Sequence, residues 1–204
     1  MKVLLINGSP NKSGCTNRAL EEVAKALNSN DIENEIIHIG KKAVQGCIAC
    51  GKCRDHERCV FNDDLYNTLF DKIKEIDGIV VGSPVYYAGP NGSLCAILDR
   101  LFYSGSKFLA NKPAAAVVSC RRGGASSSFD RLNKYFTINQ MPVISSQYWN
   151  SVHGNTPEEV EQDLEGLQIM RTLGNNMAWM LKTMNDSNYV ITREKERIAT
   201  NFIR

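Results

Sequence analysis

The sequence has little net charge and no long apolar run. Its 24 Lys and Arg residues nearly balance 22 Asp and Glu residues, which leaves a formal charge of +2 at pH 7. So small a charge does not favour nucleic acid or a membrane surface as a general partner. No stretch approaches the ~18 apolar residues of a membrane span. We therefore expect neither nucleic acid nor a membrane among the partners.

The N-terminus also lacks the pattern of a signal peptide. Residues 1–10, MKVLLINGSP, contain one lysine and a short apolar run that ends in a glycine turn, whereas a signal peptide has an apolar region of about 7 to 15 residues. We therefore expect a cytoplasmic chain, in which thiols stay reduced. An odd number of cysteines, seven, then argues against a disulfide framework and favours metal binding or redox chemistry.

Two nucleotide-binding motifs are absent as well. The chain contains neither a Walker A loop nor G-x-G-x-x-G, which disfavours an ATPase or a Rossmann dehydrogenase. Internal repeats and low-complexity segments are also missing. With 204 residues and 43% hydrophobic content, we expect one domain with a short appendage.

What is present is an alternation of strands and helices. The expected strands are residues 2–6, 34–40, 78–82, 113–119 and 141–146. The expected helices are residues 17–28, 63–76, 92–103 and 127–139, followed by a long helix from Thr156, with Pro157 and Glu159 completing its start, to about Met184. Because parallel neighbours need helical crossovers, this pattern predicts a doubly wound parallel α/β sheet with its ligands at the carboxyl ends of the strands.

The loop after the first strand, NGSPNKSGCTN (residues 7–17), concentrates glycine and hydroxyl residues before a helix start. Backbone N–H groups, hydroxyls and the positive end of a helix bind phosphate in such loops. An ordinary turn rich in Ser and Asn has a similar composition. Because ligands bind at this edge of such sheets, we favour phosphate binding.

Two further loops at the same edge suit a flat ring. GSPVYYAGPNG (residues 82–92) holds Tyr86 and Tyr87 between prolines and glycines, which favours stacking over the alternative of two core tyrosines. SCRRGGASS (residues 119–127) supplies Arg121, Arg122 and a glycine pair, and glycines let the backbone approach a ligand closely. For the arginines taken alone, a solvated loop surface is the commoner explanation.

Four cysteines lie in GCIACGKCRDHERC (residues 46–59), with the spacing C-x2-C-x2-C-x5-C. Two-residue spacers bring three thiolates to successive corners of an iron-sulfur cluster, as in ferredoxins, and a fourth cysteine closes the site. Zinc also accepts four thiolates, with His56 as a substitute ligand, although zinc sites more often pair two C-x2-C knuckles across a longer loop. Free thiols are the third interpretation. Residues 40–62 lack clear secondary structure, and a metal centre would hold so long a loop.

The remaining cysteines and histidines carry no predicted role in catalysis. Cys95 and Cys120 fall in apolar patterns typical of buried structural thiols. His38 alternates with core residues of the second strand, and His153 lies in a polar loop. We expect no catalytic side chain.

In combination, these loops and a cysteine run followed by Asp-Asp resemble the flavodoxin-like NAD(P)H-dependent FMN reductases and, more narrowly, the iron-sulfur flavoproteins. The resemblance covers about residues 1–184. It implies a flavodoxin-like, five-stranded parallel sheet in the order 2-1-3-4-5 with helices on both faces. It also implies FMN as cofactor, a [4Fe-4S] cluster, and NAD(P)H as co-substrate. Cys15 departs from the family, where Asn is frequent, and the tail from Tyr189 to Arg204 has no counterpart.

The resemblance also implies the ligand contacts. The FMN contacts are Ser9, Asn11, Lys12, Ser13, Cys15, Thr16 and Asn17 in the first loop, Pro84, Val85, Tyr86, Tyr87 and Gly89 in the second, and Ser119, Arg121, Gly123 and Gly124 in the third. The implied cluster ligands are Cys47, Cys50, Cys53 and Cys59.

We therefore expect an oxidoreductase that takes electrons into FMN and passes them, through the cluster, to a small-molecule or protein acceptor. The cluster is expected at the same sheet edge as the flavin, because strand-to-helix loops emerge there. The alternatives are a non-enzymatic electron carrier and a zinc-stabilised interaction module.

An exposed flavin edge leaves apolar surface open, which favours a homodimer or homotetramer. Residues 1–184 would form the FMN-binding domain. Residues 185–204 would extend from it and contact a neighbouring subunit through Val190, Ile191, Ile198, Phe202 and Ile203.

Overall fold

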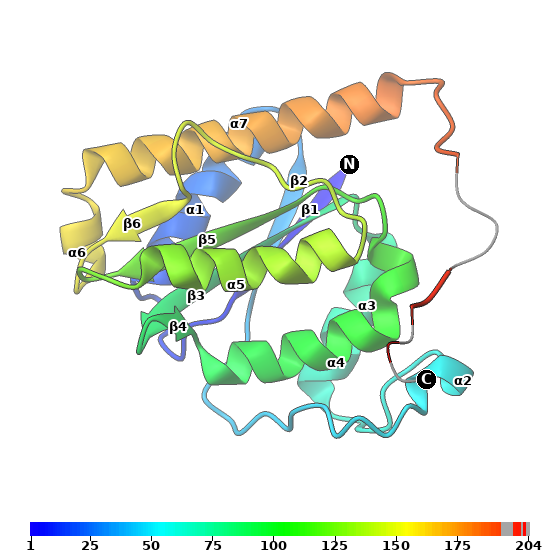
Figure 1. Cartoon of the computed structure of the whole chain (residues 1–204). Helices are drawn as coiled ribbons and strands as arrows, with labels where there is room; N and C mark the ends of the chain where they lie inside the picture. Colours follow the sequence, from blue (N-terminus) through cyan, green and yellow to red (C-terminus); the bar gives the residue numbers. More distant parts are fainter. Residues whose placement is uncertain (193–197, 201, 203–204) are drawn as a thin grey trace.

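A computed structural model describes residues 1–192, 198–200 and 202. A parallel sheet runs through its centre, with helices on both faces (Figure 1). The parallel strands are β1 (Lys2–Asn7), β2 (Glu33–His38), β3 (Gly78–Tyr86), β5 (Ala114–Cys120) and β6 (Ser151–His153). Their order, β2-β1-β3-β5-β6, confirms the predicted 2-1-3-4-5 arrangement of the doubly wound fold. A two-residue strand, β4 (Gly89–Pro90), pairs antiparallel with β3.

The first strand explains why the chain reads as continuously apolar here. Leu4 and Ile6 point into a core formed with the helices α3 (Asp64–Glu75), α4 (Gly92–Leu109) and α5 (Ala125–Ile138). Val3 and Leu5 point into a second core, formed with α1 (Cys15–Asn28) and α7 (Leu164–Asp186). Because both faces of the strand are covered, every position from Val3 to Ile6 is buried.

The prediction of a fifth strand at residues 141–146 is wrong in its position. This segment forms one parallel bridge, between Val143 and Ala114, and the chain then leaves the sheet. It returns at Asn150, whose carbonyl accepts from Val118 N at 2.9 Å and whose side chain donates to the Ala116 carbonyl at 3.0 Å. The strand β6 follows at Ser151–His153. A proline inside the expected strand, Pro142, has no N–H with which to extend the ladder.

The prediction of one long helix from Thr156 is also wrong, because two helices take its place. Thr156 caps a short helix, α6 (Pro157–Val160), by accepting from Glu159 N at 3.3 Å. Asp163 then caps α7, with one carboxylate oxygen accepting from Gly166 N at 2.9 Å and the other from His153 N at 2.7 Å. The side chain of Asp163 thus begins a second helix.

The helices α1 and α7 pack most closely at Gly174. A Cβ atom at this position would lie 2.6 Å from Ala26 Cβ and 2.8 Å from the Val23 carbonyl oxygen. Only a glycine lets the backbones approach this far without displacement.

We therefore predict that Gly174→Ala lowers the free energy of unfolding. Overpacking costs about 1 to 3 kcal/mol, which exceeds the gain of roughly 1 kcal/mol when alanine replaces glycine in a helix. Gly92→Ala is the matched control, because a Cβ there meets no atom within 4 Å. Urea unfolding of both variants measures the difference, and equal midpoints would contradict the prediction.

Candidate functional site

The loop between β1 and α1 is held by its own polar groups. Asn7, fully buried, accepts from Ser9 N at 3.0 Å and donates to the Lys12 carbonyl at 3.2 Å. Ser9 Oγ accepts from Asn11 N at 3.1 Å. These contacts fix the turn before any ligand is considered, and they leave Asn11, Lys12 and Ser13 exposed on its outer side.

The helix α1 begins at this loop without a side-chain cap. Gly14 stands at its N-cap position, and no side chain of the described residues accepts a hydrogen bond there. The first N–H groups and the positive end of the helix are thus available to an anion. Thr16 Oγ1 pairs with Ser119 Oγ at 2.7 Å, which ties this loop to the end of β5. The Asn17 amide oxygen accepts from Asn7 at 3.1 Å.

Cys15 and His38 also border the loop between β1 and α1. Partial burial raises the pKa of the Cys15 thiol, and its sulfur lies 3.5 Å from the Gly154 carbonyl. His38 Nε2 lies 2.7 Å from the Ser9 carbonyl. Both side chains hold this loop in place. The sequence patterns around them did not reveal this supporting role.

Strands β3 and β4 form a hairpin whose two-residue turn is Tyr87 and Ala88. Both residues have positive φ angles, 48° and 58°, a region that is costly for a bulky side chain. The turn leaves Tyr87 completely exposed and Tyr86 at 46% exposure. The alternative that both tyrosines belong to the core is therefore wrong. Pro84, Val85 and Gly89 lie half-buried beneath them.

The loop after β5 packs against this hairpin. Gly124 has φ +87°, and a Cβ atom there would lie 2.7 Å from Ala88 Cα. Ser127 Oγ donates to the Ala88 carbonyl at 2.6 Å. Arg121 and Gly123 are exposed beside it. The loops that follow β1, β3 and β5 thus meet at the carboxyl ends of these strands, as the sheet topology requires.

The cysteine loop (residues 40–62) leaves the sheet at the end of β2 and runs beside α4 (Figure 1). It contains one short helix, α2 (Cys53–His56). Cys47, Cys50, Cys53 and Cys59 all line one cavity of about 440 Å³. From α4, this cavity is lined by Asp99, Arg100, Tyr103 and Ser104. The four thiols that the sequence singles out are thus brought to one place.

The thiols influence one another electrostatically. Partial burial raises the pKa of Cys53, and so do the charges that Cys47, Cys50 and Cys59 would carry. Among the described residues, no three His, Cys, Asp or Glu side chains converge closely enough to hold a single metal ion. The cysteines therefore surround a space instead of meeting at one point.

The expectation that the cysteines lie at the carboxyl edge of the sheet, together with the loops predicted to bind FMN, is wrong. The hairpin borders the first residue of α4, Gly92, whereas the cysteine cavity is lined by residues 99–104. At 1.5 Å per residue, Arg100 and Tyr103 lie roughly 12 and 17 Å along the helix. The loop begins at the carboxyl edge, but its length carries the cysteines toward the other end of α4.

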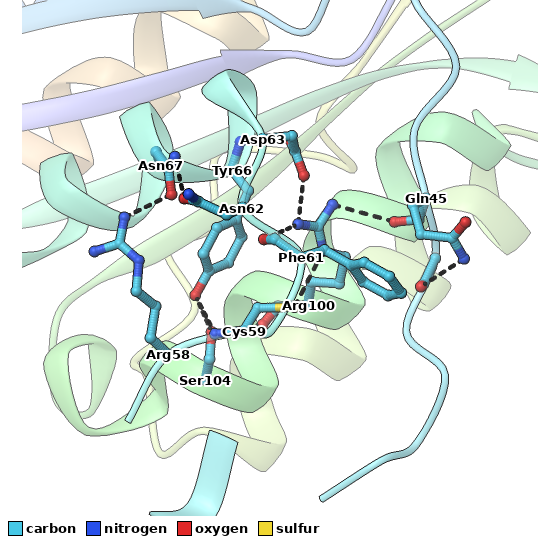
Figure 2. A network of polar contacts seen from close by, with 11 residues as sticks. Gln45, Arg58, Cys59, Phe61, Asn62, Asp63, Tyr66, Asn67, Arg100 and Ser104 are labelled. Carbon is cyan, nitrogen blue, oxygen red and sulfur yellow. Dashed lines mark hydrogen bonds and ion pairs between the residues drawn. The ribbon is translucent and has the colours of Figure 1, made fainter. Parts of the chain in front are cut away.

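Sequence reasoning missed the polar residues that hold this loop. Figure 2 shows Arg100 of α4 directed at Gln45, Phe61 and Asp63, and the Tyr66 hydroxyl directed at Cys59. Arg100 is 1% exposed. The Asp-Arg pair inside the largely apolar run AILDRLF was the available signal, since burying a charge requires partners.

The other predicted structural thiols lie away from this cavity. Cys120 is 6% exposed at the end of β5, and Cys95 is partly buried in α4. Burial raises the pKa of both thiols.

In the part of the chain that the structure describes, no helix has the length and apolar content needed to cross a membrane.

Comparison with known proteins gives a family. Residues 1–156 match the family of NADPH-dependent FMN reductases. An iron-sulfur flavoprotein of Methanocaldococcus jannaschii is 33% identical over 190 residues, which cover 89% of this chain and 98% of that protein. An iron-sulfur flavoprotein of Methanosarcina thermophila is 30% identical over 174 residues, covering 83% of this chain and 90% of that protein.

Solved structures support the fold. An NADH:FMN oxidoreductase in its apo form has a TM-score of 0.66 at 16% identity, with 88% of this chain and 89% of that chain covered. A flavodoxin from the domain Archaea has a TM-score of 0.61 at 17% identity, with 89% and 99% covered. From the extent of the family match and the identity to its relatives, the chain belongs to the NADPH-dependent FMN reductase family, within which it groups with the iron-sulfur flavoproteins.

Proposed function

We propose that the chain is an FMN-dependent oxidoreductase that uses NAD(P)H as co-substrate and holds a [4Fe-4S] cluster at Cys47, Cys50, Cys53 and Cys59. The cavity that all four cysteines line carries this proposal. A zinc ion needs its thiolates within about 2.3 Å of one point, whereas a four-iron cluster takes one thiolate at each of four separate irons. Thiols that share a cavity without converging fit the larger group better.

The three loops at the carboxyl edge fit FMN. The uncapped start of α1 and the hydroxyl-rich turn before it suit the phosphate. Exposed Tyr86 and Tyr87, held by a strained turn, suit the faces of a flat ring. At Gly123 a Cβ would meet no atom within 4 Å, so the backbone there is open to a ligand.

Bound FMN accepts a hydride as an electron pair and releases electrons singly, which is the chemistry that an NAD(P)H oxidoreductase requires. The role of this protein's own side chains is to bind the cofactors and to orient them. The loop from Ser9 to Asn17 would fix the phosphate, the hairpin would set the plane of the ring, and the bond between Thr16 and Ser119 holds two of the loops at a constant separation. The cysteines would hold the cluster as thiolates, and the positive charge of its irons offsets the electrostatic cost of gathering them.

One experiment tests the assignment against its alternatives. Protein purified without oxygen should show flavin absorbance and about four irons and four sulfides per chain, and NADPH or NADH should bleach the flavin. If dithionite bleaches the flavin but neither NADPH nor NADH does, the protein is a non-enzymatic electron carrier. Stoichiometric zinc, without iron or flavin, would indicate the interaction module.

Residues 185–204 would act between subunits of a homodimer or homotetramer, beside an FMN-binding domain of residues 1–184. Tyr189, Val190, Ile198 and Phe202 are each at least 78% exposed, and apolar surface left in water is unfavourable by about 25 cal/mol per Å². Ile191 is half exposed, and Ile203 lies outside the described residues.

We predict that light scattering gives the mass of two or four chains. A chain that ends at residue 188 should assemble with fewer chains per particle than the full chain, because the exposed apolar side chains of the tail are missing. A full chain with the mass of one protomer would contradict the prediction, and so would a truncated chain that assembles as the full chain does.

A further inference from the structure

Arg100 joins α4 to both limbs of the cysteine loop. Its Nη1 donates to the Gln45 carbonyl at 3.3 Å, before the first cysteine. Its Nη2 donates to the Phe61 carbonyl at 2.8 Å and to Asp63 Oδ2 at 2.5 Å, after the last cysteine. The side chain is completely buried, and a buried guanidinium is tolerated only with such partners. The position of the loop and the solvation of Arg100 therefore depend on each other.

The remaining hydrogen bond of Arg100 is to a cysteine sulfur. Nε donates to Cys59 Sγ at 3.4 Å (Figure 2). The backbone N–H of Cys59 donates to the Tyr66 hydroxyl at 3.0 Å, and that hydroxyl pairs with Ser104 Oγ at 2.7 Å. Cys59 is thus held at its sulfur by α4 and at its backbone by α3.

The other three cysteines lack a charged donor among the described residues. Cys47 Sγ accepts from the neutral backbone N–H of Ala49 at 3.4 Å. The thiol of Cys53 faces the Tyr103 carbonyl oxygen at 4.0 Å, and a carbonyl oxygen can only accept a hydrogen bond. Arg54 also lines the cavity, but among the described residues only Arg100 donates a hydrogen bond from a charged group to one of the four sulfurs, that of Cys59.

We propose that Arg100 is a positioning residue that holds the Cys59 sulfur against the cavity and makes a cluster bound there easier to reduce. The inference rests on the proposed function, because it concerns the same cavity. An added electron makes a cluster more negative, and hydrogen bonds and positive charge near its sulfurs favour the more negative state. A guanidinium keeps its charge throughout the working pH range, so the effect is permanent.

Three variants separate this role from that of a simple anchor. Arg100→Lys keeps a positive charge and an apolar stem but has no Nε–H group at the position facing Cys59. Asp63→Asn removes the carboxylate partner of the same guanidinium, and Tyr66→Phe releases the backbone of Cys59. Both of these controls leave the Nε–H contact to the sulfur in place.

The measurements are iron, sulfide and flavin content after anaerobic purification, and a redox titration of the cluster absorbance. We expect Arg100→Lys to retain its flavin and to have a more negative midpoint potential than wild type. Neither control should shift the potential to a more negative value, because both keep the Nε–H contact and Asp63→Asn only removes a negative charge from the guanidinium. An unchanged potential in Arg100→Lys, or the same shift in all three variants, would overturn the inference.

If Arg100→Lys loses its iron, the controls decide. The positioning role is supported if both controls keep their clusters without a shift to a more negative potential, and it is overturned if either loses its cluster as well. A wild-type protein that contains flavin but no iron would instead refute the cluster in the proposed function, and this inference with it.

Discussion

Replacing Cys50 with serine should remove most of the iron and sulfide from protein prepared without oxygen, while the flavin content stays at the wild-type value. Cys50 is one of the four thiols around the cavity, and a cluster held by four thiolates is destabilised when one ligand is lost. The loops proposed to bind FMN lie beside the other end of α4, so the loss should not reach them. Iron, sulfide and flavin analyses of wild type and variant measure the result.

Cys95→Ser is the matched control for this experiment. Cys95 also lies in α4 and is partly buried, but it does not line the cavity. It should retain about four irons per chain. Wild-type iron in Cys50→Ser would show that Cys50 is not a ligand, and equal losses in both variants would show that the effect is not specific to the cavity.

Removing two hydroxyls at the loop between β1 and α1, in the double variant Ser9→Ala and Thr16→Ala, should weaken FMN binding. Ser9 Oγ accepts from Asn11 N at 3.1 Å and Thr16 Oγ1 pairs with Ser119 at 2.7 Å. Their loss loosens the turn and its link to β5, in addition to any hydrogen bond to the phosphate itself. We expect a loss of about 1 to 3 kcal/mol, which corresponds to a dissociation constant roughly 5 to 150 times larger.

Flavin fluorescence titration of the flavin-free protein measures this constant. Ser29→Ala with Thr137→Ala is the control, because these hydroxyls contact only helix carbonyls, of Lys25 and Lys134, at exposed positions. The control should bind FMN like wild type. Unchanged FMN affinity in the double variant of the loop would refute the assignment of the phosphate to this loop. The iron content of that variant should stay at the wild-type value.

Local patterns in the sequence were sufficient for the central strands of the sheet. A strand covered on both faces requires an uninterrupted apolar run, so β1, β3 and β5 were visible without knowledge of their partners. The alternation with helices then determined the parallel topology, and this topology places the loops after β1, β3 and β5 at one edge. The spacing of the four cysteines likewise predicted a shared site.

Contacts between distant segments decided the rest. Asp163 divides the predicted long helix because its carboxylate serves both Gly166 and His153, and β6 begins where Asn150 reconnects the chain to β5. Neither partner is apparent from a helical or strand period, which reports only on neighbours along the chain.

The place of the cysteines depended most on the tertiary structure. The spacing of Cys47 to Cys59 determines which thiols lie near one another, but it does not determine the side of the molecule on which the loop lies. That side is set by the contact of Arg100 with Cys59, 41 residues apart, and with Gln45, 55 residues apart. A buried charge must find its partners wherever the fold brings them, and for that reason only the folded chain shows that the cysteine loop lies along α4.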